Sequence, residues 1–392
     1  MAEPVICAVA RTPVGKFRGV LRSHSASQLG AVAVMELLQR AGIEPDSDTV
    51  EELIFGQVLQ AGAGQAPARQ VAIFAGLPYT TPCTTVNKVC GSSLKAAMIA
   101  ASAIRAGEYE VVVAGGMESM SNAPHFAQKT GRDEYDEMQS ILLHDGLWDA
   151  YNDEHMGITG ENVACEFGIS RAESDAFSAR SHRLADQAWE AGWMEWEAFP
   201  LEGVDRDGNE VIVTKDEGIR AGTDADELAE LSPVFQEDGQ VTAGNASQLS
   251  DGASAVLVAS RERAEKEGWP ILARIVDQTT SGVEPERVMV APIPAVETLL
   301  ERNGLTIDDI DFVEHNEAFA SASCAVAKQL GIADEKFNPH GGAVAIGHPL
   351  GATGTRLLMT LISALQRNGG GRGIATICLG GGNAVAMLIA VD

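Results

Sequence analysis

The chain has few cysteines and no long apolar run. Six cysteines occur in 392 residues and none form a Cys-x-x-Cys pair, so neither a zinc site nor a disulfide framework is predicted. No apolar run reaches the roughly 20 residues that cross a bilayer, and the N-terminus MAEPVICAVARTP lacks the basic segment of a secretory signal. We therefore expect a cytoplasmic protein with no metal site and no membrane partner.

Basic residues are scarce relative to acidic ones. Lys and Arg number 28 against 55 Asp and Glu, which gives a net charge of −27. This charge repels nucleic acids and anionic membranes, so neither is expected as a partner. We interpret it as adaptation to high salt, where counterions screen charges within about 3 Å at 1 M. The alternative is an acidic protein that works at ordinary salt.

Strand-like apolar runs alternate with helix-like segments, which predicts an α/β fold. Residues 26–41 are predicted as a helix that ends at Gly42. Residues 92–105 are apolar on nearly all faces, so a buried helix is expected there. Residues 110–114 (EVVVA) are predicted as a buried strand that Gly115 and Gly116 terminate.

The C-terminal third repeats this plan, with a helix over 353–366 and a strand over 374–378. Residues 305–319 also match residues 47–60 in position, so two similar halves are predicted. The segment between them lacks this rhythm and is strongly acidic over 195–238. We place the boundaries at 1–118 with 249–270 for the first half, 119–248 for an inserted loop domain and 271–392 for the second half.

Cys90, in TTVNKVCGSSLKA, precedes the predicted buried helix. Ser92 or Ser93 can cap that helix. A thiol at a helix N-terminus faces the positive end of the macrodipole, which lowers its pKa and favours the thiolate. Gly91 allows another backbone or a ligand to approach closely. Cys90 is therefore a candidate nucleophile, and the alternative is a small buried residue.

Two glycine-rich stretches carry further candidates. His348 lies in GGAVAIGHPLGATG, where it could be a general base for Cys90 or a structural residue of a turn. The stretch lacks the Gly-Lys-Ser/Thr ending of a phosphate loop. Cys378 ends a predicted strand before three glycines whose N–H groups suit an oxyanion hole. Taken alone, Cys378 would more often be a core residue.

A polar triplet interrupts EHNEAFA, residues 314–320. Asn316 could hold a water or a carbonyl oxygen, and Glu317 could orient its neighbours. If the preceding strand continues, the side chain of His315 points opposite to that of Asn316. We therefore interpret His315 as structural.

Together, VNKVCGSSLKA, HNEAFA, NPHGGAVAIGHPLGATG and CLGGGNAVA resemble the thiolase family, specifically its short-chain acetyl-CoA C-acetyltransferases. Supporting stretches, GGMESMSNAPH and DEHMGITGENVA among them, extend the resemblance over essentially the whole chain. It implies a five-layer αβαβα fold of two similar halves with mixed sheets, and a loop domain that covers the coenzyme A channel. It also implies a homo-oligomer. Residues 120–145 resemble the loop that joins dimers into tetramers, so we expect a tetramer, with a dimer as the alternative.

The resemblance also assigns roles. Cys90 would take the acyl group as a thioester, and His348 would activate it. Asn316 would hold a water that forms one oxyanion hole with His348. Cys378 would move the proton at the α-carbon of the second acyl-CoA, and the backbone N–H groups of Cys90 and Gly380 would form the second oxyanion hole. No metal or cofactor is implied, because coenzyme A thioesters are the substrates.

Substrate contacts carried over from the family are Ser247 at the pantetheine, His155 and Met156 at the acyl group, Arg220 on the adenine side, and Phe235, Ala318 and Phe319. The sequence departs from the family pattern at Ser93, His315, Asn383 and Glu227. Ser93 would slightly crowd the turn after the nucleophile. An acid at Glu227, near coenzyme A phosphates, would weaken binding at low salt.

The implied activity is the reversible Claisen condensation of two acetyl-CoA to acetoacetyl-CoA and CoA through acetyl-Cys90. A thiolate is a better acyl carrier than an alkoxide, and backbone N–H donors can stabilise the enolate oxygen. A broader-chain 3-ketoacyl-CoA thiolase is the alternative. A non-catalytic acyl-CoA-binding subunit would have lost Cys90, His348 or Cys378, and all three are present.

Overall fold

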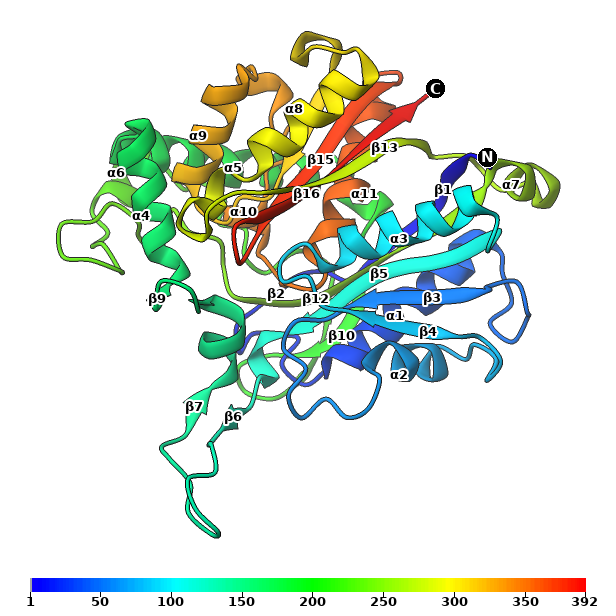
Figure 1. Cartoon of the computed structure of the whole chain (residues 1–392), viewed down its shortest axis with the longest axis horizontal. Coiled ribbons are helices and arrows are strands. Elements are labelled where there is room, and N and C mark those ends of the chain that lie inside the picture. Colours follow the sequence, from blue (N-terminus) through cyan, green and yellow to red (C-terminus); the bar gives the residue numbers. More distant parts are fainter. Residues whose placement is uncertain (1) are drawn as a thin grey trace.

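The computed structural model describes residues 2–392 and is built on one large mixed sheet (Figure 1). Its strands lie in the order β14-β15-β16-β13-β1-β12-β5-β3-β4, with the short strand β2 (Gly15–Lys16) beside β12. The first half contributes β1 (Pro4–Arg11), α1 (Ala26–Ala41), β3 (Glu52–Gly56), α2 (Pro67–Phe74), β4 (Cys83–Val86), α3 (Ser92–Ala106), β5 (Val111–Ser119) and β12 (Ser250–Ser260). After α7 (Arg261–Glu267), the second half contributes β13 (Ala273–Gly282), α8 (Pro292–Asn303), β14 (Phe312–His315), α9 (Ala320–Leu330), α10 (Ala343–Ile346), α11 (Thr353–Arg367), β15 (Gly371–Leu379) and β16 (Asn383–Val391).

The two halves share one strand arrangement, as the sequence match predicted. β3 is parallel to β5, and β12 and then β1 follow as antiparallel neighbours. In the second half β14 is parallel to β15, and β16 and then β13 follow in the same way. The halves join through a short pairing of Val5 and Ile6 with Arg274 and Ala273, so their strands form one continuous hydrogen-bonded sheet.

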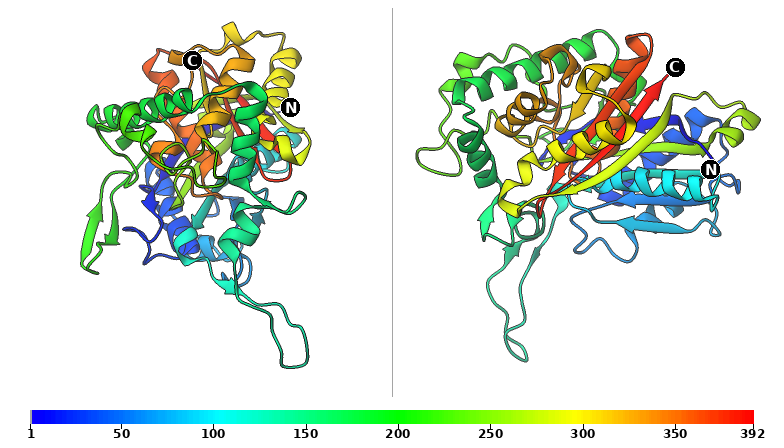
Figure 2. Two further views of the ribbon diagram at one scale, coloured as in Figure 1. Left: turned by 90° about the vertical axis from the view of Figure 1, so that its left-hand side faces the viewer. Right: turned by 45° about the horizontal axis from the view of Figure 1, so that its top comes forward.

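Helices form three layers, one outside each half and one between the halves. With the strands of each half as the other two layers, this confirms the predicted five-layer architecture (Figures 1 and 2). α1 and α2 cover the outer face of the first half, and α8 and α9 lie on the outer side of the second half. α3 and α11 pack against each other between the halves. Two of the candidate residues, Cys90 and His348, lie just before the N-terminal ends of these two central helices.

The predicted helix over 26–41 is confirmed, and its ends are defined by local chemistry. Ser25 accepts from the backbone N–H of Gln28, whose side chain accepts from Ser25 in return. Gly42 ends the helix in the left-handed conformation with φ 66°.

Two local predictions near the site are wrong. Gly115 and Gly116 do not end a strand, since β5 continues to Ser119. They are glycines because other backbone lies against them: a Cβ at Gly116 would lie 1.9 Å from the carbonyl oxygen of Gly351. The cap of α3 is Gly91 and not a serine. Ser92 instead accepts from the N–H of Lys88 at 2.9 Å and so closes the turn that precedes the helix.

The segment between the halves contains three helices, α4 (Met156–Phe167), α5 (Arg171–Glu190) and α6 (Ala225–Ala229). It also contains three strand pairs: β6 (His125–Phe126) with β7 (Gln139–Ser140), β8 (Trp148–Asp149) with β9 (Glu154–His155), and β10 (Leu201–Val204) with β11 (Glu210–Val213). The β6–β7 hairpin projects far from the rest of the molecule (Figure 2).

Not all acids of 195–238 lie on the surface, since Glu197 and Asp216 are buried against Arg11 at 2.7 Å each. Within residues 2–392, no helix combines the length and apolar character needed to cross a membrane.

Candidate active site

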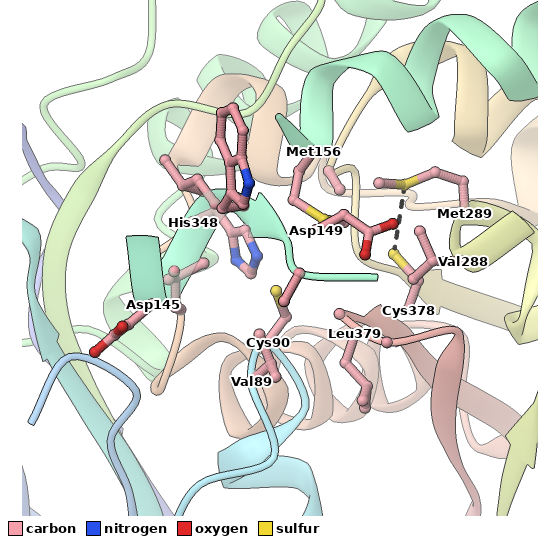
Figure 3. A pocket seen from close by; sticks show the side chains of 18 of the residues that line it. Val89, Cys90, Asp145, Asp149, Met156, Val288, Met289, His348, Cys378 and Leu379 are labelled. Carbon is pink, nitrogen blue, oxygen red and sulfur yellow. Dashed lines mark hydrogen bonds between the residues drawn. The ribbon is translucent and has the colours of Figure 1, made fainter. Parts of the chain in front are cut away.

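A cavity of about 220 Å³ lies where the two halves meet, and Cys90, His348 and Cys378 all line it (Figure 3). Cys90 comes from the turn before α3, His348 from the loop before α11 and Cys378 from the end of β15. The imidazole of His348 and the thiol of Cys90 point toward each other (Figure 3). The sequence motifs that are widely separated along the chain thus meet at one point.

The turn that carries Cys90 is tightly constrained. Val89, immediately before it, adopts the left-handed conformation at φ 45°, which is strained for a β-branched residue. Its N–H donates to Oδ1 of Asn87 at 3.0 Å. A Cβ at Gly91 would lie 2.5 Å from a methyl carbon of Leu379, so the predicted close approach occurs, and the approaching group is a side chain of the second half.

The predicted lowering of the Cys90 pKa is wrong, because burial raises the pKa of this thiol well above its ordinary value. Cys378 and Glu118 nearby act in the same direction. The backbone N–H groups of Cys90 and Gly380 hydrogen-bond the sulfur and oppose the rise. Desolvation outweighs the helix dipole here, so the free thiol is neutral and needs a base before it can attack.

His348 is buried and held at three points. Its backbone N–H donates to the carbonyl of Gln248 at 3.0 Å. Nδ1 lies 2.7 Å from Oγ1 of Thr353, and Nε2 lies 3.4 Å from Nδ2 of Asn316. Burial lowers the pKa of His348 to about 3, with a further contribution from Arg356. The ring is therefore neutral at physiological pH, as a general base must be.

Asn316 does not line the cavity, but its amide contacts Nε2 of His348, the ring nitrogen opposite to the one that Thr353 contacts. Its side chain is fully buried, and its Oδ1 has no hydrogen-bond partner. Glu317 is turned away from the cavity: its carboxylate accepts from Ser181 at 2.7 Å and from Asn338 at 2.8 Å. His315 stacks on Phe337 with ring centroids 5.6 Å apart, away from the cavity.

Cys378 contacts Met289 at the cavity wall, with the two sulfurs 3.9 Å apart (Figure 3). Burial raises the pKa of Cys378 to about 12, so this thiol is also protonated at rest. The Gly380 N–H that hydrogen-bonds the Cys90 sulfur follows directly on β15. The second half thus contributes a thiol and a backbone donor to the same small space.

Among the expected substrate contacts, Met156, Ser247, Ala318 and Phe319 line the cavity. His155 and Phe235 lie behind it and stack at 4.6 Å, with Phe235 edge-on to Phe319. Nδ1 of His155 accepts from the N–H of Gly157 at 2.9 Å and caps α4. His155 and Phe235 therefore support the wall without forming it.

Arg220 is not brought to the cavity. Its guanidinium lies 3.1 Å from Nε2 of His182, which is fully buried. Glu227 is exposed on α6. Ser93 does not simply crowd its turn, because its Oγ accepts from the N–H of Thr355 at 3.0 Å and links α3 to α11.

Several wall residues were missed from the sequence: Leu147, Trp148, Asp149, Tyr151, Val288, Met289 and Leu350. Most lie in helices or strands of six residues or fewer, which are too short to show a periodic pattern in the sequence. Another missed residue is Glu118, within GGMESM. Its buried carboxylate accepts from the N–H groups of Val58 at 3.0 Å, Leu59 at 3.2 Å and Gly351 at 3.0 Å, and so anchors the His348 loop. Burial raises the pKa of Glu118 to about 7.

No group of three or more His, Cys, Asp or Glu side chains within residues 2–392 is arranged to hold a metal ion. The cavity brings together the thiols of Cys90 and Cys378, the neutral imidazole of His348 and two backbone N–H groups. Such a set can carry an acyl group, move a proton and stabilise an oxyanion.

A duplicated α/β fold that joins a cysteine from each half in one cavity defines a class of acyl-transfer enzymes. The family models of the thiolase N-terminal domain and the thiolase C-terminal domain match residues 4–262 and 269–391. The chain belongs to the thiolase family.

The chain is similar to known relatives over its full length. The chain is 46% identical to an acetyl-CoA acetyltransferase of Pseudomonas aeruginosa over 100% of both chains. It is 46% identical to one of Cupriavidus necator over 99% of both. Among solved structures, human mitochondrial 3-ketoacyl-CoA thiolase matches with a TM-score of 0.95 at 36% identity, covering 100% of this chain and 99% of that one. The Acat5 thiolase from Ascaris suum in complex with coenzyme A matches with a TM-score of 0.92 at 38% identity, covering 100% of both.

Proposed function

We propose that the protein is an acetyl-CoA C-acetyltransferase that condenses two acetyl-CoA to acetoacetyl-CoA and CoA, reversibly, through acetyl-Cys90. The observation that carries the proposal is the meeting of Cys90, His348 and Cys378 in one cavity of about 220 Å³. Relatives that are 46% identical over the whole chain and named acetyl-CoA acetyltransferase support the substrate.

In the first half-reaction, His348 takes the proton of the Cys90 thiol at Nε2, and the thiolate attacks the carbonyl carbon of acetyl-CoA. The C–S bond to coenzyme A breaks, and Cys378 gives its proton to the departing CoA thiolate. This leaves an acetyl thioester on Cys90, an imidazolium at His348 and a thiolate at Cys378. The raised pKa of Cys378 fits this order, because the thiol stays protonated until a leaving group needs its proton.

In the second half-reaction, the Cys378 thiolate removes a proton from the α-carbon of a second acetyl-CoA. The enolate attacks the acetyl carbon on Cys90, a C–C bond forms, and the Cys90 C–S bond breaks. The imidazolium returns its proton to Cys90, so every group regains its starting state. The N–H groups of Cys90 and Gly380 would stabilise the oxyanion that forms on the acetyl group. Asn316 would position a water for the oxyanion of the second substrate, beside His348.

The side chains around the cavity support a short acyl group. Met156, Met289 and Phe319 wall it, and Phe235 fills the space behind Phe319. Ser247 is held at the wall by donating its backbone N–H to the carbonyl of Ala318 at 2.9 Å, where it could meet the pantetheine. The likeness to a solved 3-ketoacyl-CoA thiolase keeps longer chains as the alternative. Values of kcat/KM for ketoacyl-CoA of increasing length separate the two, since acetyl specificity predicts a steep fall beyond four carbons.

The direct test is intact-protein mass after mixing with acetyl-CoA in high salt, followed by peptide mapping. We expect one acetyl group, on Cys90, and none on the exposed Cys165, which serves as the internal control. Cys90→Ser should take up no acetyl group. Acetyl transfer at a normal rate in this variant would contradict the mechanism.

We further propose that residues 119–248 cover the coenzyme A channel, with Arg220 moving from His182 to the adenine side when substrate binds. We propose a cytoplasmic tetramer joined through the projecting β6–β7 hairpin, which carries the exposed side chains of Tyr135 and Met138. Light scattering after chromatography should give the mass of four chains. The Tyr135→Glu, Met138→Glu double variant should give that of two.

Salt adaptation is also proposed, supported by 55 acidic against 28 basic residues. Coenzyme A is an anion, so counterions should assist both folding and substrate binding. We expect activity to rise with KCl to molar concentration. A maximum near 0.1 M would contradict the proposal.

A further inference from the structure

Thr353, the first residue of α11, contacts the imidazole of His348 on the side away from the cavity. Its side chain is buried, and it lies in the same glycine-rich stretch as His348. Oγ1 lies 2.7 Å from Nδ1 of His348 and 2.9 Å from the carbonyl oxygen of Pro349. This hydroxyl has one proton for these two contacts, so its partners decide where that proton lies.

The carbonyl of Pro349 can only accept, and the contact is a hydrogen bond only if Thr353 donates to it. The oxygen of Thr353 must then accept from Nδ1–H of His348. The contact at the other ring nitrogen supports the same proton placement, because the amide nitrogen of Asn316 lies 3.4 Å from Nε2 and can only donate. The other tautomer would place two oxygen lone pairs together at Pro349 and two N–H groups together at Asn316.

We propose that Thr353 is the positioning residue that fixes His348 as the Nδ1–H tautomer and so leaves Nε2 unprotonated and able to take the proton of Cys90. The inference rests on the proposed role of His348 as the base. A neutral imidazole has one basic nitrogen, and it serves Cys90 only if that nitrogen faces the cavity. Within residues 2–392, Thr353 is the one side chain that forms a hydrogen bond with Nδ1 of His348.

The first test needs no variant of Thr353. Nitrogen-15 NMR of histidine-labelled protein distinguishes a protonated from an unprotonated ring nitrogen, and His348→Gln identifies the signals of His348. We expect the proton on Nδ1 at pH 7.5. A proton on Nε2 in the wild-type protein would overturn the proposal.

The second test uses Thr353→Val, which keeps the shape and removes the hydroxyl, and Thr353→Ser, which restores it. Iodoacetamide alkylation of Cys90, followed by peptide mass, reports proton removal from the thiol without any substrate. We expect alkylation and single-turnover acetylation to slow at least tenfold in the valine variant, with KM for acetyl-CoA changed less than twofold. The serine variant should recover to within about threefold of wild type. Equal rates in the valine and wild-type proteins would also overturn the proposal.

These readouts separate this inference from the proposed function. If wild-type Cys90 is alkylated by a Thr353-dependent route but takes up no acetyl group, the tautomer assignment stands and the acetyltransferase proposal fails. Thermal unfolding of each variant is the folding control. If Thr353→Val does not fold, the NMR measurement on the wild-type protein alone decides the inference.

Discussion

The ammonium group of Lys88 donates to Oδ1 of Asn383 at 3.2 Å, and this contact joins the two halves beside the cavity. Lys88 lies two residues before Cys90, and Asn383 lies three residues after Gly380. The hydrogen bond therefore connects the two turns whose N–H groups bond the Cys90 sulfur. Asn383 is also one of the positions at which the sequence was expected to depart from the family pattern.

If this link sets the distance between the two turns, its removal should slow acetylation of Cys90. A hydrogen bond to a charged group contributes about 1.5–3 kcal/mol when buried, and these side chains are partly exposed, so we expect about a fivefold fall in kcat for Asn383→Ala. Lys88→Met should fall equally, and the double variant should be no slower than either. Additive losses in this cycle, measured by single-turnover acetylation, would mean that the two side chains act independently.

Replacing the second thiol should separate the two half-reactions. In Cys378→Ala we expect acetylation of Cys90 to continue at a reduced rate while condensation falls about 10³-fold, the scale of a lost proton-transfer group. Mass spectrometry follows the first step, and acetoacetyl-CoA absorbance follows the second. Cys165→Ala, at an exposed position, is the matched control and should be unchanged. Survival of both steps in Cys378→Ala would remove the proton-transfer role.

The close approach of two backbone segments at Gly116 predicts a strong effect of a single methyl group. A Cβ there would lie 1.9 Å from the carbonyl oxygen of Gly351, in the loop that carries His348. We expect Gly116→Ala to lower the free energy of unfolding by about 3 kcal/mol and to reduce kcat at least tenfold. Gly282→Ala is the control, since a Cβ on that strand glycine would have its nearest neighbour at 3.5 Å. Denaturant unfolding of both variants checks the difference.

The buried imidazole of His315 should make the protein sensitive to acid. Burial lowers its pKa to about 3, whereas an unfolded histidine titrates near 6.5, so the unfolded state binds the extra proton between these values. Stability is therefore lost as pH falls below about 6.5. At pH 5.0 the loss from this one group is about 2 kcal/mol.

His315→Phe should remove that part of the acid sensitivity. Urea unfolding at pH 7.5 and pH 5.0 should show a drop about 2 kcal/mol smaller in the variant than in the wild type. Ser323→Ala, which removes the hydroxyl 3.2 Å from Nδ1 but keeps the imidazole, is the control and should retain the full pH dependence. An identical pH dependence in His315→Phe would assign the acid sensitivity to other groups.

Local signals in the sequence were enough to place much of the framework. The helix over 26–41 and its end at Gly42 were predicted and are confirmed in α1, and the matched segments 47–60 and 305–319 indicated the duplicated strands. The glycines next to Cys90, His348 and Cys378 singled out these three residues as candidates for the site. By contrast, the role of Gly116 depends on Gly351, which is distant in the chain, and no local pattern carries that information.

The pKa of Cys90 was predicted in the wrong direction for a related reason. The helix dipole is a local property and can be inferred from sequence, whereas desolvation depends on everything that packs around the thiol. Likewise, the segment that holds Leu147, Trp148 and Tyr151 consists of elements too short to show periodicity, so their place at the cavity wall is visible only in three dimensions.

The central position of β1 has a consequence for synthesis on the ribosome. This strand, Pro4–Arg11, hydrogen-bonds to β12 and β13, and its first residue pairs with Ser260. At roughly 5–20 residues per second, the N-terminal strand is exposed for about 12 to 50 seconds before either neighbour has been made. During that interval its apolar residues lack their native partners, and the segment made directly after it, residues 12–43, holds four basic side chains and one acidic one, so it supplies no acidic repulsion. We therefore expect β1 to depend on a nascent-chain chaperone to keep chains on the same polysome apart.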